Sequence, residues 1–346
     1  MTPSKKSKLM QSASMALFVL APLSAAHAQS VTVTDTVAIT ADASKSTDQK
    51  NTNDVTGTST SASNTLSAGD STGSSITLDL TSSGALAVGN SASTSLLDAD
   101  SAANATTAAL GAFQSNDGTA APAATTVGAI STGSSLTVTT GTLTGSSASL
   151  LNSTDSATAT SNSLTQSLVL SSATLGTGTA GGSVDTTTAP TDLAALGSVL
   201  VISRQQNTLN ETTGSNTGST VALTSGAAED SSLDVMGNSQ AAAATGSTVT
   251  NSLTLAGSTV SPGAAIGAVQ ANDADSAVLA TTTASASLTA ASLEGSAATV
   301  GENEVLARAV GGSTSNTLAI DATTVTLAAP DVTAAATLAA GSGIVS

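Results

Sequence analysis

Two pairs of aspartates are the residues whose type and spacing point most directly to chemistry. Asp98 and Asp100 form one pair, and Asp273 and Asp275 form the other, each with one alanine between the two acids. Carboxylate oxygens are hard ligands that suit Ca²⁺, and extracellular calcium sites can be weak. The alternative, which we favour, is that these acids lie in turns and are solvated. Calcium is therefore the one candidate cofactor, and these four aspartates are its candidate ligands.

No nucleophile with a matching base is found in the sequence. Serine is abundant, but a serine nucleophile needs a general base, usually histidine, and the single histidine, His27, lies in the N-terminal segment. Paired carboxylates could act on a glycan as acid and base, but most acids stand in turn-like contexts. We predict no catalytic or cofactor-binding residue, and a carboxylate-dependent glycan-acting enzyme is the enzymatic alternative.

The N-terminus is typical of a secretory signal peptide. Its positive charges are Lys5, Lys6 and Lys8. An apolar run over residues 15–21 follows, and Ala26-His27-Ala28 forms a small-x-small cleavage site before Gln29. The apolar run is shorter than the about 20 residues that a membrane-spanning helix requires. We expect residues 1–28 to be removed and the mature chain to be secreted, to the extracellular space or the bacterial cell surface.

The composition of this mature chain excludes several classes of protein. Phe113 is its only aromatic residue, it has no Cys, Trp, Tyr or His, and its 4 basic residues face 23 acidic ones. Nucleic-acid binding needs a basic face, and an anionic membrane surface repels an acidic chain. No later segment is long and apolar enough to span a membrane. We expect neither a nucleic-acid partner nor a membrane span, and no disulfide framework.

Many short segments alternate between apolar residues and small polar ones, mostly threonine, as half-buried strands do. They are residues 31–40, 76–80, 136–138, 168–170, 221–223, 253–255 and 318–320. Clusters of Gly, Asn, Asp and Ser separate these segments, as turns require. Periodicity typical of helices is weak. The sequence therefore predicts an all-β protein.

Three of the segments belong to a repeat. Residues 152–175 align without gaps with residues 237–260 at an offset of 85, and residues 303–325 form a third copy. The shared pattern is A-x-A-x-[G/S]-x4-[N/Q]-[S/T]-L-x-[L/I]-x4-[L/V]. It predicts a strand of small residues, a turn, and a strand of larger residues.

A second motif and the prolines suggest a longer period. Residues 108–117 match residues 264–273, and a looser Gln205-Gln206-Asn207 lies between them. The prolines of the mature chain are Pro122, Pro190, Pro262 and Pro330. We predict repeat units near residues 122–189, 190–261 and 262–329. They lie within a repeat region of residues 61–329, which an N-terminal strand and polar segment (29–60) precedes and a truncated last repeat (330–346) follows.

Stacked repeats bury apolar rows that one strand pair cannot bury alone. Because the chain has almost no aromatic residues, we expect a thin core and an elongated, β-solenoid-like array of strand repeats. The alternative architecture is a β-sandwich fibre subunit with a donor strand.

Two apolar segments are candidates for self-association. The run Val199, Leu200, Val201 and Ile202 is either a buried strand or a subunit-contact strand. The alternating segment with Val31, Val33, Val37 and Ile39 follows the cleavage site directly. It is either the first strand of the fold or a donor strand that completes a neighbouring subunit.

The repeats resemble the secreted β-strand-repeat surface proteins of Gram-negative bacteria: holdfast-anchoring proteins, fibre subunits of the curli-like type and repeat adhesins. The resemblance lies in the units around Gly246–Leu255 and Gly311–Ile320 and in the pairs Gln114/Asn116 and Gln270/Asn272. It covers about residues 60–330 and implies roles in fibres, adhesion or matrix. We therefore expect a non-enzymatic structural protein that forms a homo-oligomer or fibre, with an outer-membrane anchor or an extracellular polysaccharide as further candidate partners. A surface-layer lattice is the alternative.

Overall fold

The computed structural model describes residues 14–17, 20–36, 43–98, 108–118, 125–171, 174–175, 199–260, 264–273, 275–325 and 343–345. Every regular element in these residues is a β-strand, and no helix occurs among them. The strands form four sheets, and all strand pairs except one are parallel. This confirms the predicted all-β class. The described residues show no closed solenoid.

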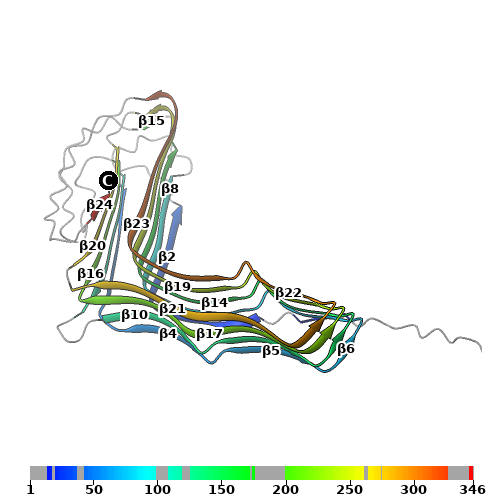
Figure 1. Cartoon of the computed structure of the whole chain (residues 1–346). Helices are drawn as coiled ribbons and strands as arrows, with labels where there is room; N and C mark the ends of the chain where they lie inside the picture. The colour runs from blue at the N-terminus through cyan, green and yellow to red at the C-terminus, as the bar shows by residue number, and fades with distance from the viewer. Residues whose placement is uncertain are drawn as a thin grey trace, which may run out of the picture.

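The chain follows one path four times, and each pass pairs in parallel with the pass before it (Figure 1). The first pass holds β3 (Ala43–Asn51), β4 (Val55–Thr60), β5 (Ser63–Ala68), β6 (Ser71–Thr72), β7 (Ser75–Asp79) and β8 (Ser82–Asp98). The second holds β9 (Ala108–Asp117), β10 (Thr125–Thr132), β11 (Ser135–Thr140), β12 (Leu143–Thr144), β13 (Ser147–Leu151), β14 (Thr154–Ser171) and β15 (Thr174–Leu175). The third holds β16 (Val199–Thr208), β17 (Asn210–Glu229), β18 (Ser232–Met236) and β19 (Ser239–Val260). The fourth holds β20 (Ala264–Asn272), β21 (Ala277–Glu294), β22 (Ala297–Gly301) and β23 (Glu304–Val325).

Three further strands lie at the ends of the stack of passes. β1 (Ser14–Leu17) pairs with β7, and β2 (Leu20–Thr36) pairs with β8. At the other end, β24 (Gly343–Val345) pairs with β20 and is the one antiparallel strand of the described residues.

The long strands β8, β14, β19 and β23 confirm the repeat alignment. Thr154 pairs with Ser239, which is the predicted offset of 85, and Ser239 pairs in turn with Glu304. The leucines of the three copies fall into one column, in which Leu168, Leu253 and Leu318 are neighbours. Equal side chains thus stack on each other from pass to pass.

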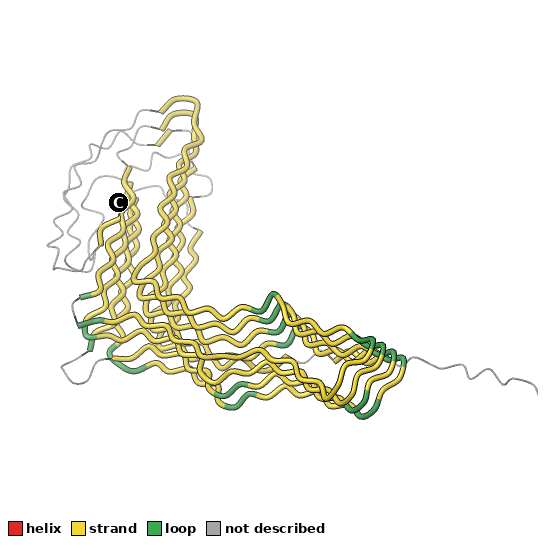
Figure 2. The backbone as a smooth tube through the Cα atoms, in the orientation of Figure 1, coloured by secondary structure: helices red, strands yellow, loops and turns green. Residues whose placement is uncertain are grey.

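The turn predicted inside each repeat is wrong, because each repeat is a single strand that bends. The pairing register skips one residue at the bend, which is Gly89, Ser161, Gly246 or Gly311 in the successive passes. None of these four residues has a positive φ, and the strand continues through each of them. The bend divides the molecule into two arms (Figure 2).

Each arm is a thin sandwich of two sheet surfaces. In the arm that ends at β6 and β22, the sheet of β4, β10, β17 and β21 faces β7, β13, β18 and β22 and the first halves of the long strands. In the other arm, the second halves of the long strands face β3, β9, β16 and β20. The chain therefore follows an angled path in every pass.

Side-chain size varies along the arms. Beside the bend, the core is built mainly of alanines, such as Ala87, Ala129 and Ala159. Farther out it is built of larger residues, such as Leu78, Leu150 and Leu223 in one arm and Leu168 and Leu253 in the other. Alanine lets the two sheets approach closely at the bend, whereas leucine supplies most of the buried apolar area, worth about 1.5–3 kcal/mol for each fully buried side chain. The core is thin, as expected from a chain with almost no aromatic residues.

Candidate functional site: polar ladders and the open last pass

One glutamine from each pass forms a buried ladder along the stack. Gln114 Nε2 donates to Gln49 Oε1 at 2.6 Å, and Gln205 Nε2 donates to Gln114 Oε1 at 2.7 Å. In the fourth pass, Gln270 Nε2 donates to Gln205 Oε1 at 2.9 Å. The second proton of each amide goes to a backbone carbonyl of the facing long strand, for example Gln114 Nε2 to Ser163 O at 2.9 Å. Every glutamine is therefore held in one orientation.

An asparagine ladder lies two residues farther along the same strands. Asn51 Nδ2 donates to Asn116 Oδ1 at 3.1 Å, Asn116 Nδ2 to Asn207 Oδ1 at 3.1 Å, and Asn207 Nδ2 to Asn272 Oδ1 at 2.6 Å. Asn162 inserts between these rungs, because its Oδ1 accepts from Asn116 and its Nδ2 donates to Asn207. The ladder is thus buried and hydrogen-bonded both along and across the stack.

The asparagines also explain the bend in the long strands. Asn116 Nδ2 donates to Ser161 O at 3.0 Å, and Asn207 Nδ2 donates to Gly246 O at 3.1 Å. These carbonyls lie where the strand register skips, so the side chains replace ladder bonds that the backbone has lost. Asn272 Nδ2 likewise donates to Gly311 O at 3.0 Å in the fourth pass. A buried carbonyl without a partner would cost about 1–3 kcal/mol, so the ladder stabilises the bend in the second, third and fourth passes.

The two ladders point in opposite directions along the stack. Each glutamine donates to the pass before it, whereas each asparagine donates to the pass after it. At the last described pass, Gln270 Oε1 is the acceptor end of one ladder, and Asn272 Nδ2 is the donor end of the other. The stack therefore has two chemically different ends.

The second pass contains a buried carboxylate, Asp155, in the arm that ends at β6 and β22. Asp155 accepts a hydrogen bond from Ser83 Oγ at 2.7 Å and one from Ser131 Oγ at 3.1 Å, and Ser219 Oγ donates to its other oxygen. These hydroxyls come from β8, β10 and β17. Asp155 thus connects both sheets of the arm through hydroxyl donors.

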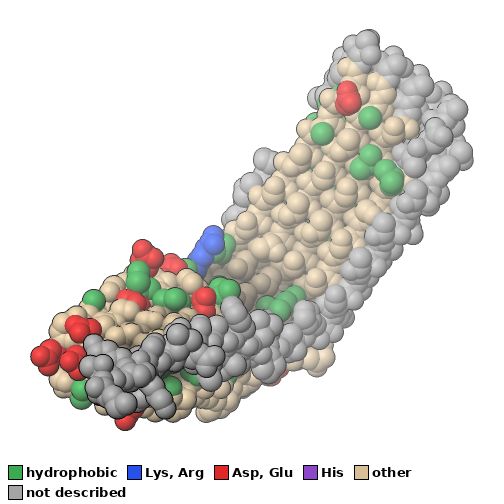
Figure 3. All heavy atoms as spheres, turned by 90° about the vertical axis from the view of Figure 1, so that its right-hand side faces the viewer, with side chains coloured by type: hydrophobic (Ala, Val, Ile, Leu, Met, Phe, Trp, Pro, Cys, Tyr) green, Lys and Arg blue, Asp and Glu red, His purple; other side chains and the backbone are tan. Residues whose placement is uncertain are grey.

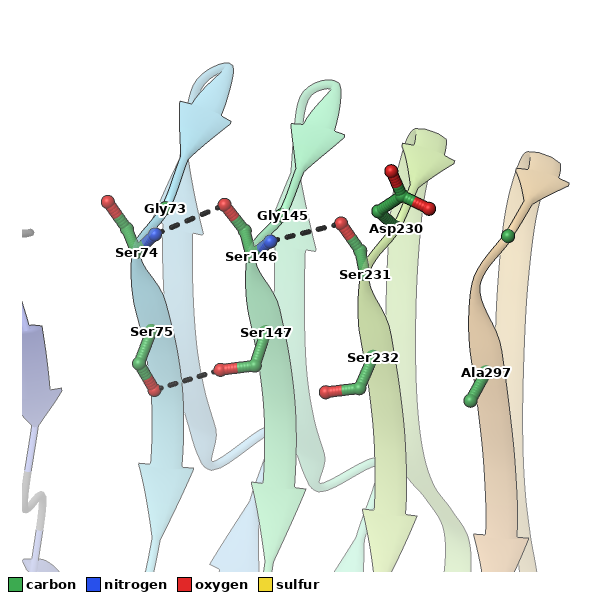
Figure 4. Close-up of a pocket in the computed structure, with 11 residues that line it drawn as sticks. Gly73, Ser74, Ser75, Gly145, Ser146, Ser147, Asp230, Ser231, Ser232 and Ala297 are labelled. Atoms are coloured by element: carbon green, nitrogen blue, oxygen red, sulfur yellow. Dashed lines mark hydrogen bonds between the residues drawn. The ribbon is translucent and has the colours of Figure 1, made fainter.

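A row of serines lies in the turns that precede β7, β13 and β18 and lines an open groove (Figure 4). Ser74 N donates to Ser146 Oγ at 3.2 Å, and Ser146 N donates to Ser231 Oγ at 3.1 Å. The Ser146 hydroxyl in turn donates to Thr144 O in its own turn. Since these hydroxyls already bond the turns to each other, the groove is a structural part of the stack.

The fourth pass leaves its apolar column residues open to solvent. Leu318 is 46% exposed, whereas Leu168 and Leu253 in the same column are 0% exposed. Val300 is 52% exposed, while Leu150 and Val235 in its column are fully buried. The other large exposed residues of this pass are Leu279, Leu293, Val305 and Leu306. Figure 3 shows hydrophobic side chains among acidic ones on the surface of the arm that ends at β6 and β22.

The apolar run at residues 199–202 lies in β16, between β9 and β20. Val199, Val201 and Ile202 are buried, and the first two belong to the core of their arm. Leu200 lies on the same strand. Of the two interpretations given above, the buried strand is confirmed for the three buried residues. Both edges of β16 are already paired, so this run offers no edge to a second copy.

The candidate donor segment lies partly in β2. The backbone at Val31 pairs with Ala92 and that at Val33 with Thr94, both in β8. Val37 and Ile39 lie outside the described residues, as do Pro122, Pro190, Pro262 and Pro330, so the predicted unit boundaries stay predictions.

The aspartates predicted as calcium ligands are not brought together by the described residues. Asp273 Oδ1 accepts from the backbone N of Asp275 at 3.2 Å and from Ser276 Oγ at 3.3 Å, so it caps a turn. Asp98 ends β8, and Asp100 lies outside the described residues. Within the described ranges, no three acidic or histidine side chains gather as a metal site. Calcium binding by the two pairs stays a prediction.

Only part of the ladders is predicted from the sequence. The pairs Gln114/Asn116 and Gln270/Asn272 and the looser match at 205–207 are recognised there, whereas Gln49 and Asn51 are not. The signal was present as a Q-x-N motif that recurs in β3, β9, β16 and β20, since Gln49, Gln114, Gln205 and Gln270 are each followed two residues later by asparagine.

No helix in the described part of the chain has the length and apolarity needed to cross a membrane. Comparison of the chain with protein-family models, with curated proteins and with solved structures gives no match.

Proposed function

We propose that this chain is a secreted structural protein of the bacterial cell surface or extracellular matrix. It acts without catalysis, by self-association of its β-repeats into fibres that serve adhesion, biofilm formation or holdfast attachment. Its passes are the turns of a β-solenoid-like array, in which each pass is the template for the next.

The observation that carries this proposal is the open fourth pass. Leu318 and Val300 are half exposed although their column neighbours in the inner passes are buried. An apolar edge with unused backbone hydrogen-bonding groups is a template for another chain, and monomeric proteins usually protect such edges.

The polar interior supports the same function. Ladders of stacked glutamine and asparagine, as at Gln205 and Asn207, stabilise parallel in-register stacks of strands. Export supports it as well, because the N-terminal segment up to Ala28 has the layout of a secretory signal peptide.

The test is to purify residues 29–346 and to follow assembly by sedimentation velocity and negative-stain electron microscopy. We expect fibres that form at micromolar protein and persist in a calcium chelator. A chain that stays monomeric under these conditions would contradict the proposal. Two-dimensional sheets that dissolve on chelation would instead favour the surface-layer lattice. Mass spectrometry of the protein exported by the native cell tests cleavage before Gln29.

A further inference from the structure

We propose that copies of the mature chain add head to tail, with the first pass of one copy pairing in parallel on the fourth pass of another. This inference rests on the proposed function and on removal of residues 1–28. It names the partner of the open fourth pass as a second copy of this chain.

The strands of the two end passes fit each other in length and position. β20 and β3 both have 9 residues, and β22 and β7 both have 5. Within one chain, β3 is already related to β20 through β9 and β16 without a gap in register. The same register places Gln49 of the second copy beside Gln270 and Asn51 of that copy beside Asn272. It also places β7 of the second copy beside β22.

The direction of the polar ladders selects head-to-tail contact. In the first pass, the buried Gln49 donates through Nε2 to Ser91 O. Among the described strands β3 pairs with β9 alone, so no further glutamine precedes Gln49 in the ladder. Gln270 Oε1 at the other end is an acceptor, so the glutamine ladder continues from one copy into the next. The asparagine ladder continues in the opposite sense, from Asn272 Nδ2 to Asn51 Oδ1. Contact between two first passes or two fourth passes would place like groups together and is disfavoured.

The apolar columns continue across the same contact. Leu318 belongs to the column of Leu96, and Val300 belongs to the column of Leu78. Burying each half-exposed side chain under the next copy is favourable at about 25 cal/mol for every Å² removed from water. A head-to-tail contact thus gives the fourth pass the cover that each inner pass already has.

Two short segments cover parts of these edges and must leave them. Removal of residues 1–28 takes away β1, which lies on β7, and the part of β2 that lies on the first half of β8. Residues 29–36 remain on the second half of β8, and β24 covers Ala268–Gln270 at the other end. Both segments occupy positions that the second copy takes, so docking displaces them and assembly starts slowly.

Cysteine cross-linking tests this arrangement directly, because the chain contains no cysteine. Thr77 in β7 and Thr299 in β22 belong to one column, and Thr299 is exposed. Head-to-tail contact brings their Cα atoms to about 4.8 Å, within the range for a disulfide. In one chain they are three strand spacings apart, roughly 14 Å, so no disulfide can form within a copy.

The experiment mixes mature Thr77→Cys with mature Thr299→Cys during assembly under mild oxidation. We expect a disulfide-linked heterodimer that forms at least roughly tenfold faster than a homodimer of either variant alone. Thr77→Cys mixed with Ser287→Cys is the matched control, since Ser287 is exposed on β21 and belongs to the column of Thr65. This control pair should not cross-link.

Each outcome is informative. Homodimers of Thr299→Cys alone would show contact between two fourth passes and overturn the proposal. Fibres of the wild-type chain without the Thr77–Thr299 cross-link would also overturn it, yet would leave the proposed function intact. Absence of any assembly by the wild-type chain would contradict both. As a second measurement, Val300→Lys, at an exposed position, should keep the strand content seen by circular dichroism and prevent fibre growth.

Discussion

The third and fourth passes have the same path and nearly the same residue pattern, but they differ in their surroundings. Leu253 and Gly246 of the third pass are enclosed between two other passes, whereas among the described strands Leu318 and Gly311 of the fourth have a neighbour on one side only. The difference teaches that burial in this molecule comes from the adjacent passes and not from a pass itself. The same substitution at equivalent positions of the two passes should therefore have different effects.

The largest difference is expected in the leucine column. Leu253→Ala should lower the free energy of unfolding by about 2–5 kcal/mol, because it leaves a cavity in a core that cannot collapse. Leu318→Ala removes a side chain that is 46% exposed and should cost less than half as much. Urea titration of the monomeric mature chain, followed by circular dichroism, measures both. Equal losses would refute the claim that the fourth pass is open.

The second comparison is between Asp155 and Val305, which occupy the same column of the stack in the second and fourth passes. Asp155→Ala removes the carboxylate that accepts from the hydroxyls of Ser83, Ser131 and Ser219 and should cost about 2–3 kcal/mol. Val305 takes the equivalent place in the fourth pass and is exposed, so Val305→Ala should change stability by no more than about 0.5 kcal/mol. The same titration compares them, and a harmless Asp155→Ala would show that the hydroxyl cluster is not structural.

Next comes the glutamine ladder. Gln205→Ala removes both a donor and an acceptor in the buried interior and should cost about 2 kcal/mol. Gln270→Ala removes the last rung, whose outer oxygen has no following pass, and should cost about half as much in the monomer. The second variant should nevertheless slow fibre growth. A fibre growth rate unchanged by Gln270→Ala would show that the glutamine ladder does not continue from one copy into the next.

The smallest difference is expected at the bend. A Cβ added at Gly246 would lie 2.4 Å from Gly311 O, whereas a Cβ at Gly311 would meet nothing closer than Asn272 Nδ2 at 3.4 Å. Gly246→Ala should therefore cost about 1 kcal/mol through overpacking, and Gly311→Ala should be nearly neutral. Thermal unfolding followed by circular dichroism is sensitive enough, and a destabilised Gly311→Ala would mean that the bend of the fourth pass is also enclosed.

Much of the stacking could be predicted from the sequence because column neighbours have similar side chains. Leu168, Leu253 and Leu318 repeat at the spacing that the strands use, so the alignment of the sequence is also the register of the sheet. Gln114 and Gln270 were recognised for the same reason.

The bend could not be predicted in this way. A small residue such as Gly246 within a strand pattern is compatible with a turn or with a bent strand. Which of the two forms depends on a contact between residues that are distant in the sequence. Asn207 Nδ2 donates to the carbonyl of Gly246 across 39 residues of chain, and this bond lets the strand continue through the bend. The exposure of the fourth pass could not be predicted either, since Leu318 belongs to the same motif as the buried Leu253.

The bend has a mechanical consequence for a fibre of the proposed kind. Because every pass bends at the same position, head-to-tail growth would repeat one angled outline along the whole fibre (Figure 2). An angled beam resists flexing in two perpendicular directions, whereas a flat ribbon of the same strands is soft in one. Asn207 and its counterparts, which hold the bend through backbone carbonyls, would then set the rigidity of a filament on the scale of the cell.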